Sequence, residues 1–290
     1  MCNGRPVVSP VLTLLAFFHR ERHLVHPALR SAVLAVEEAA RHGVGCRIVA
    51  VIDRGDAFTC AQVSRFRPKL DAIHEVDFGD LSCARNHGIA NVDTKYFALL
   101  DGDDLFDPDW LWKGVQFLEG RDDERIVAHA EVRLNFGAES YGRIQIGTDS
   151  PLFHPLNLIA SWHYAADIIA HTALFRRLPF LPCDRAHNLG SEDWHWTCES
   201  IVEGIQHAVV PETVYFYRRQ PNHVSLGSLR GFTFLPTRLL GRAMVPTLDA
   251  AYPSAAIRFA DRSRGPLGDQ RRWTCMPPWL EVKVGQACEI

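Results

Sequence analysis

The stretch YFALLDGDDLFDPDW (residues 96–110) joins an apolar run of strand length to five aspartates. Its first five residues predict a strand buried on both faces. Asp101, Asp103 and Asp104 follow at once, and Gly102 among them is expected to let a ligand approach the backbone. Clustered carboxylates repel one another unless a cation lies among them, and Mg²⁺ or Mn²⁺ is typically held by one or two carboxylates plus phosphate oxygens. The stretch therefore predicts a cation site, with a solvated acidic turn as the alternative.

The other two aspartates have a structural explanation. Asp107 is expected to be the N-cap of a helix over Trp110–Leu118, because Pro108 suits a first helical position and Asp109 favours the positive end of the helix dipole. We therefore assign only the first three aspartates to the site.

Working outward, apolar runs alternate with amphipathic ones. The predicted strands are Val11–Phe18, Arg47–Ile52, Ile73–Val76 and Tyr96–Leu100, and the predicted helices are Pro27–His42 and Ser82–Asn91, with Ser82 as cap. Such alternation predicts a parallel sheet covered on both faces. Ligands of these sheets gather at the carboxyl ends of strands, where Asp53 and Asp101 both lie.

The bulk composition is that of a globular protein. The 290 residues are 47% hydrophobic and 22% charged, and the net charge of -3 gives no support to nucleic-acid binding. No apolar run reaches the roughly 18 residues of a membrane span. The eight cysteines show no CxxC spacing, and no signal peptide is recognisable. We expect reduced thiols, no zinc site and a cytoplasmic protein, at most peripheral to a membrane.

The second half of the chain is less regular. A strand is predicted from Ile126 to Phe136, and a helix from Ser191, as its cap, to Gly204, as its stop. Another strand is predicted over His207–Arg219. Beyond residue 228 the periodicity fades, so we expect an irregular C-terminal extension there.

A family resemblance unites these features. The segment Asp80–Leu111 resembles the family-2-type nucleotide-sugar glycosyltransferases of the GT-A fold, which show a Leu-Ser-x-Ala-Arg-Asn-x-Gly helix, an apolar strand, Asp-x-Asp-Asp and a Pro-Asp-Trp-Leu-like helix start. Here the two motifs stand at residues 81–88 and 101–104. Two upstream segments match less well, since residues 16–21 share only Arg20 and Glu21, and residues 51–59 share Asp53 and Gly55.

The resemblance implies an α/β fold of the GT-A type, Rossmann-like, with a mostly parallel sheet flanked by helices and an irregular C-terminal extension. Residues 1–228 would form the glycosyltransferase domain, with a donor-binding half over about residues 10–120 and an acceptor half over about residues 121–228. Residues 229–290 would be the extension.

The donor-side roles are also implied by the resemblance. Asp53 would bind the nucleotide base, Asp101 would face the ribose or share the metal, and Asp103 would be the main metal ligand. Arg85 would lie near the diphosphate, with a helix-surface arginine as the alternative. Bound Mn²⁺ or Mg²⁺ would neutralise the charge on the leaving diphosphate.

The acceptor side is implied by a Glu-Asp pair that opens a later helix. Asp193 takes the position of the general base, and Glu192 would bind or orient the acceptor. The alternative is a pair of acids placed to favour the helix dipole, which itself lowers the pKa of a base. Trp194 and Trp196 are expected either to stack on a sugar or to pack in the core.

Two later residues are expected to complete the site. Arg218 would bind the diphosphate and His223 the metal, with a strand-end arginine and an exposed loop histidine as the alternatives. His207 precedes an apolar strand and is interpreted as structural.

The predicted function is that of an inverting, metal-dependent glycosyltransferase of the hexosyltransferase type. The donor would be a nucleotide-sugar, a UDP-sugar by preference, and the acceptor a hydroxyl of a glycan, a lipid-linked or a small molecule. One alternative is a GT-A protein without turnover that only binds glycan or nucleotide. Another is a phosphotransferase of the haloacid dehalogenase type, although Asp104 stands where that class has Thr or Val.

Overall fold

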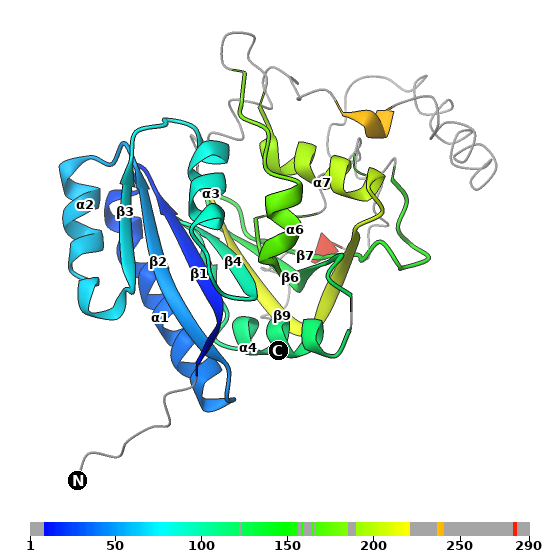
Figure 1. Ribbon diagram of the computed structural model, residues 1–290, viewed down its shortest axis with the longest axis horizontal. Coiled ribbons are helices and arrows are strands. Elements are labelled where there is room, and N and C mark those ends of the chain that lie inside the picture. The colour runs from blue at the N-terminus through cyan, green and yellow to red at the C-terminus, as the bar shows by residue number, and fades with distance from the viewer. Residues whose placement is uncertain are drawn as a thin grey trace.

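The computed structural model describes residues 9–121, 123–155, 158, 164, 166–184, 190–220, 237–240 and 281–282. These residues form one sheet with helices on both faces (Figure 1). The strands are β1 (Pro10–Phe18), β2 (Gly45–Asp53), β3 (Ala72–Val76), β4 (Tyr96–Asp101), β5 (Leu105–Phe106), β6 (Ile126–Gly137), β7 (Tyr141–Ile144), β8 (Ile168–His171), β9 (Gln206–Arg219) and β10 (Glu281–Val282). The α-helices are α1 (Val25–Arg41), α2 (Ala57–Ser64), α3 (Leu81–Ala90), α4 (Trp110–Glu119), α6 (Thr172–Arg177) and α7 (Glu192–Val202). Short 3-10 turns are Arg22–Leu24, Arg67–Lys69 and Arg238–Leu240.

The sheet is parallel in one half and mixed in the other. Its order is β10-β7-β6-β8-β4-β1-β2-β3, with β9 paired to both β6 and β5. The predicted parallel arrangement is confirmed for β3, β2, β1 and β4. In the other half β8 runs antiparallel to β4 and β6, and β7 antiparallel to β6. Strand β9 runs parallel to β6, so the expected mostly parallel sheet is confirmed. The exceptions include β6 and β7, because their connection, residues 138–140, is too short to join parallel strands.

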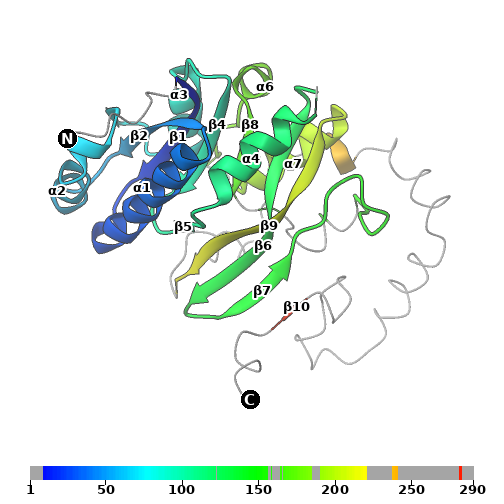
Figure 2. The same cartoon turned by 90° about the horizontal axis from the view of Figure 1, so that it is seen from below.

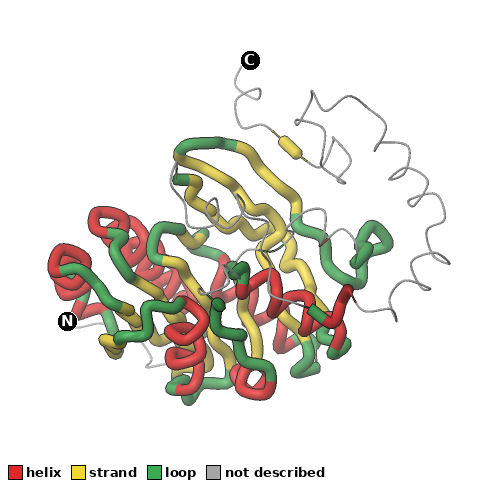
Figure 3. Tube along the Cα trace, turned by 90° about the horizontal axis from the view of Figure 1, so that it is seen from above, coloured by secondary structure: helices red, strands yellow, loops and turns green. Residues whose placement is uncertain are grey.

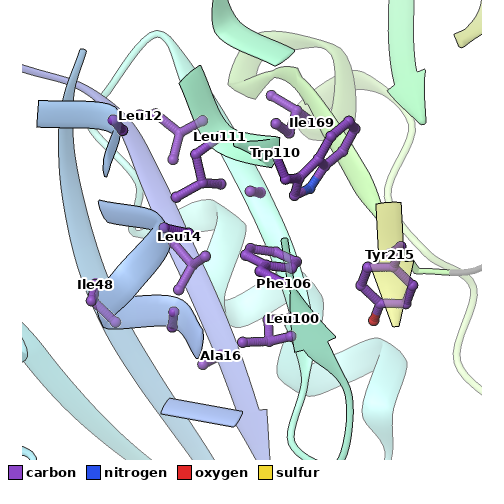
Figure 4. Packing of buried hydrophobic residues seen from close by; sticks show 14 of the residues in the cluster. Leu12, Leu14, Ala16, Ile48, Leu100, Phe106, Trp110, Leu111, Ile169 and Tyr215 are labelled. Atoms are coloured by element: carbon purple, nitrogen blue, oxygen red, sulfur yellow. The ribbon is translucent and has the colours of Figure 1, made fainter. Parts of the chain in front are cut away.

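Alternate residues of the central strands pack into two cores. Leu12 and Leu14 of β1 face the core beneath α1 and α4, where Trp110 lies beside them (Figure 4). Leu15 and Phe17 face the opposite core, which α3, α6 and α7 cover. Figure 2 shows α1 and α4 together on one side of the sheet. Burial on both faces explains why these strands are apolar throughout.

Two short segments beyond residue 228 contact this body. β10 pairs with β7, as Figures 2 and 3 show. Arg238 forms an ion pair with Glu199 of α7 at 2.5 Å. None of the helices within the described residues has the length and apolar character needed to cross a membrane.

The helix starts differ from the predicted ones. Helix α3 is capped by Asp80, whose Oδ1 accepts a hydrogen bond from the Cys83 amide at 3.0 Å, whereas the predicted cap Ser82 is the second residue of the helix and is buried. Ser191 precedes α7 with φ at 63°, and its side chain makes no capping bond within the described residues. A left-handed serine cannot aim its hydroxyl into the first turn as an extended N-cap does.

Helix α4 begins at Trp110, directly after Asp109. The predicted cap Asp107 lies two residues before Asp109, and its Oδ1 accepts a hydrogen bond from the Asp109 amide at 3.2 Å. Helix α2 was not predicted, although Asp56 caps it by accepting a bond from the Thr59 amide at 2.7 Å. The sequence did carry a signal for this helix start, because Asp56 stands three residues before Thr59, as an N-cap does before the amide that it binds.

Candidate active site

The candidate site lies where β1, β2 and β4 end. In the sheet register Phe17 is opposite Asp101 and Phe18 is opposite Ile52. Asp53 and Asp101 therefore flank the carboxyl end of β1, where ligands of such sheets bind.

Arg85 joins the donor-side and acceptor-side carboxylates. Its Nη2 donates to both carboxylate oxygens of Asp101, at 2.8 and 3.1 Å, and its Nη1 donates to Glu192 Oε1 at 3.1 Å. The Arg85 side chain is 1% exposed, so the alternative of a helix-surface arginine is wrong. Three elements, α3, β4 and α7, thus meet at one guanidinium.

The electrostatics of this cluster follow from burial. Burial disfavours the charge of Arg85, but Asp101 and Glu192 outweigh it and raise its pKa. Burial, and then Glu192, raises the pKa of Asp193 to about 8, against the opposing effects of Arg85 and of the Trp194 amide. The helix N-terminus was expected to lower the pKa of this carboxyl. In the structure burial prevails, which gives Asp193 a pKa suited to proton transfer near neutral pH.

Asp103 is held by the end of β9. Its Oδ2 accepts a hydrogen bond from Gln220 Nε2 at 2.7 Å, and its carbonyl accepts one from Arg218 Nε at 2.7 Å. The predicted neighbour Arg218 is therefore beside Asp103, with its guanidinium 4.3 Å from the ring centre of Phe136. Gln220 was missed, because nothing in its local sequence distinguishes it from a loop residue.

Asp104 has a structural role. It is 1% exposed and accepts hydrogen bonds from the Tyr215 hydroxyl at 2.7 Å and the Arg218 amide at 2.6 Å. Burial, reinforced by Asp103 and Asp101, raises the pKa of Asp104 well above its usual value. This carboxyl fastens β9 to the turn and faces away from solvent.

Gly102 is needed for packing against β1. A Cβ added there would lie 2.5 Å from the Phe17 carbonyl oxygen and 2.6 Å from Phe18 Cδ1. Close approach of the turn to a neighbouring strand therefore requires this glycine, and access of a ligand to its backbone stays a prediction.

Asp53 organises the loop before α3. Its carboxylate accepts hydrogen bonds from the amides of Phe78 and Gly79 at 2.8 Å and of Asp80 at 2.9 Å. A contact of Asp53 with a nucleotide base stays a prediction, and these bonds show what holds the carboxylate in place.

Glu21 belongs beside the site as well. Its carboxylate accepts a hydrogen bond from the His19 amide, and its Cγ lies 3.1 Å from the position of a Cβ on Gly102. Burial raises the pKa of Glu21, and the charge of Asp103 adds to the shift. The partial match of residues 16–21 to the family motif was the available signal.

The donor set suits a cation shared with phosphate. Among the described residues, no group of three or more histidine, cysteine or acidic side chains is placed to hold a metal alone. Asp101 and Asp103 on one accessible turn match the one or two carboxylates that Mg²⁺ or Mn²⁺ uses when phosphate oxygens complete its shell. His223 lies outside the described residues.

The two tryptophans of α7 belong to the core. Trp194 and Trp196 are 4% and 3% exposed, and their indole nitrogens donate to the carbonyls of Leu158 and Leu178, both at 2.7 Å. They pack beneath the site, so the expectation that they stack on a sugar is not supported. His207 is fully buried, in agreement with the structural interpretation.

Two solved structures have a similar fold. The chain is similar to S. aureus TarS 1-349 in complex with UDP-GlcNAc, at 16% identity and a TM-score of 0.56, over 73% of this chain and 59% of that one. It is also similar to the mannosyltransferase PcManGT from Pyrobaculum calidifontis in complex with GDP-Man and Mn²⁺, at 15% identity and a TM-score of 0.54, over 89% and 76%. The chain spans less than two thirds of TarS 1-349. The likeness confirms the GT-A type of fold.

The family is shown by sequence. No curated protein has a significantly similar sequence. The model of the family described as Glycosyl transferase family 2 matches residues 21–181, which is more than half of the chain and includes Arg85 and the aspartates of the turn. The alternative of a haloacid dehalogenase-type phosphotransferase is therefore wrong. The chain belongs to glycosyl transferase family 2.

Proposed function

We propose that the enzyme is an inverting, metal-dependent hexosyltransferase that moves a sugar from a nucleoside-diphosphate donor to a hydroxyl acceptor. The observation that carries this proposal is the buried bridge from Asp101 through Arg85 to Glu192, beside Asp193. It brings the carboxylates assigned to the donor and those assigned to the acceptor within reach of one transferred sugar.

The donor is proposed to be a UDP-sugar. One of the similar structures is a complex with UDP-GlcNAc and another is a complex with GDP-Man and Mn²⁺, which supports a nucleotide-sugar and a divalent cation in general. Asp103, with Asp101, would hold Mn²⁺ or Mg²⁺ together with the diphosphate, and the cation would neutralise charge on the leaving group. Arg218 would lie at the same phosphates.

The chemistry needs one base. The acceptor oxygen forms the new bond to the anomeric carbon while the bond from that carbon to the phosphate oxygen breaks, and its electron pair leaves with the diphosphate. Asp193 takes the proton of the acceptor hydroxyl, and its raised pKa suits that transfer near neutral pH. Glu192, held by Arg85, would orient the acceptor.

The acceptor is a glycan, a lipid-linked molecule or a small molecule. The division of the chain near residue 228 and a cytoplasmic location, peripheral to a membrane at most, also stay predictions.

Calorimetric titration tests the proposal. UDP and GDP are titrated into the parent and into Asp103→Ala, with Mn²⁺ and with a chelator. We expect one nucleotide to bind with Mn²⁺ only, and Asp103→Ala to lose that binding. The matched control is Asp109→Ala, which removes an acid of the same segment that contacts Trp112 and Lys113 instead. Metal-independent binding, or equal loss in both variants, would contradict the proposed cation site.

A further inference from the structure

A small cavity lies behind Asp193. Its volume is about 10 Å³, room for about one water molecule. The polar part of its lining comes from Arg85, His129, Asp193, Thr197 and His207, and the rest is apolar. A buried site of this size holds water when two to four polar groups surround it.

Two nitrogens of this lining need a partner. Arg85 Nε and His129 Nδ1 are buried and make no hydrogen bond within the described residues. Both side chains are 1% exposed, and both line the cavity. An unsatisfied buried polar atom costs about 1–3 kcal/mol, so a water molecule that bonds both would stabilise the folded protein.

The hydrogen bonds of the neighbouring His207 decide which ring nitrogen of His129 carries no proton. The Ser200 hydroxyl donates its one hydrogen to the Thr197 carbonyl at 2.7 Å, so His207 Nε2 must donate to Ser200 Oγ, also at 2.7 Å. Burial lowers the pKa of His207 well below its usual value, so the ring is neutral and its Nδ1 is an acceptor. His129 Nε2 therefore donates to His207 Nδ1 at 2.8 Å. Neutral His129 is left with a lone pair on Nδ1.

The carboxylate of Asp167 lies close enough to stabilise a positive charge on His129. Asp167 is 0% exposed, and its Oδ2 accepts hydrogen bonds from the Ala130 amide at 3.1 Å and from Gln145 Nε2 at 2.6 Å. Its other oxygen lies 3.8 Å from His129 Nδ1. This distance is too long for a hydrogen bond but close enough for strong attraction between buried charges.

We propose that one water molecule in this cavity links the Asp193 carboxylate to His129 Nδ1, with Arg85 Nε–H as its third partner, and that it relays a proton between them. The proposal rests on the proposed role of Asp193 as base. His129 acts through Asp193 and is a positioning residue.

The relay consists of two proton transfers, from Asp193 to the water molecule and from the water molecule to His129. After Asp193 has taken the acceptor proton, its carboxylic acid gives that proton to the water, and the water gives one of its own to His129 Nδ1. The products are the Asp193 carboxylate, an unchanged water molecule and a His129 imidazolium, which faces Asp167. Once the product has left, the reverse path returns the proton to Asp193, which releases it to solvent and becomes a carboxylate again.

The groups around His129 are few. Tyr164 stacks on its ring, with centroids 4.2 Å apart, and His207 of β9 bonds its Nε2. Asp167 approaches from before β8, Asp193 from α7 and Arg85 from α3. Any pH dependence of the relay is set by these groups.

A crystal structure of the full chain at atomic resolution tests the water directly. We expect electron density within hydrogen-bond distance of Asp193, His129 Nδ1 and Arg85 Nε. A cavity without ordered density would overturn the proposal.

Kinetics of His129→Gln test the proton path. The glutamine amide can still donate to His207 but cannot receive a proton at Nδ1. The readout is release of nucleoside diphosphate from UDP-GlcNAc or GDP-mannose, whichever binds, with water as acceptor. We expect a rate about 10-fold lower, a smaller loss than that of a general base itself. In mixtures of H₂O and D₂O, we expect a curved rate dependence for the parent, from two protons in flight, and a straight one for the variant.

The matched control is His171→Gln, because His171 is 6% exposed, lies on β8 and does not line the cavity. It should keep the parent's rate and curvature. If Asp193→Asn slows release while His129→Gln leaves rate and curvature unchanged, the relay is wrong and the base assignment stands. If Asp193→Asn also reacts at the parent rate, the proposed base fails with it. If His129→Gln does not fold, the crystal density decides.

Discussion

Arg85 Nη1 donates a 3.1 Å hydrogen bond to Glu192 Oε1, although 107 positions separate the two residues in the chain. The same guanidinium binds Asp101, so one buried cation serves the carboxylates of both halves of the site. Changes to Arg85 should therefore affect stability and both substrates together.

Replacing Arg85 by Met should lower the free energy of unfolding by about 3–5 kcal/mol, because it leaves buried carboxylates without their counter-charge. Urea denaturation at neutral pH measures this. Arg47→Met is the control, since Arg47 pairs with Asp93 at the surface and such pairs contribute about 0–1 kcal/mol. Similar losses of unfolding free energy in the two variants would show that the buried ion pairs of Arg85 stabilise the protein no more than a surface pair does.

Asp193→Asn should reduce donor turnover by about 10²–10⁴-fold while leaving nucleotide affinity nearly unchanged. The parent's rate should rise with pH and level off near pH 8, because the base works as a carboxylate and burial raises the pKa of Asp193 to about 8. Rates are measured as nucleoside diphosphate release across pH. The control is Asp93→Asn, which changes an exposed acid and should leave both the rate and its pH profile as in the parent.

The same substitution should change how stability depends on pH. The pKa of Asp193 is raised on folding from 3.8 to about 8, so this group favours the folded state below pH 3.8 and loses that contribution as pH rises towards 8. Asp193→Asn should therefore gain stability relative to the parent across this window, by at most about 1.4 kcal/mol per pH unit. Denaturation curves of both proteins at several pH values check it. A constant difference between them would mean that the carboxyl titrates normally.

Gly102→Ala should destabilise the protein by about 1–3 kcal/mol, because the new methyl overlaps the Phe17 carbonyl and the turn must shift. Nucleotide affinity should fall as well, since the shift moves the flanking Asp101 and Asp103. Gly120→Ala is the control: φ is −71° and the nearest atom to its Cβ lies at 3.4 Å, so it should cost nothing or stabilise slightly. Thermal unfolding and calorimetry report the two effects.

Asp104→Ala should be costlier than Tyr215→Phe. The first leaves the Tyr215 hydroxyl and the Arg218 amide buried without their acceptor, at about 1–3 kcal/mol each, while the second removes one hydrogen bond worth about 1 kcal/mol. Chemical denaturation ranks the two variants. The reverse order would mean that the Asp104 carboxyl does not hold the Tyr215 hydroxyl and the Arg218 amide.

The sequence predicts the parallel half of the fold well because its central strands β1 and β4 are buried on both faces and read as continuous apolar runs. β1, β2, β3 and β4 are all found where expected, and the aspartates of the turn do lie at the end of β4. Asp101, Arg85 and Glu192 lie close together, and the roles that the family resemblance implies for them stay predictions.

What could not be predicted depends on long-range contacts. The mixed half of the sheet contains short antiparallel strands such as β7 and β8, whose pairing is decided by neighbours and not by local pattern. The meeting of Gln220 with Asp103 and of Tyr215 with Asp104 joins positions more than a hundred residues apart. Asp104 looked like a ligand because sequence shows its charge and not its burial.

The end of β9 is tied to the turn by the bonds from the Arg218 amide to Asp104 and from Gln220 to Asp103. A hybrid enzyme could therefore be spliced just after Gln220: the graft would begin from an anchored point, and strands β1 to β9 would keep their native sequence. Recombination at this junction offers a way to exchange the C-terminal segment between family members while Asp53, Asp101 and Asp103 stay as they are.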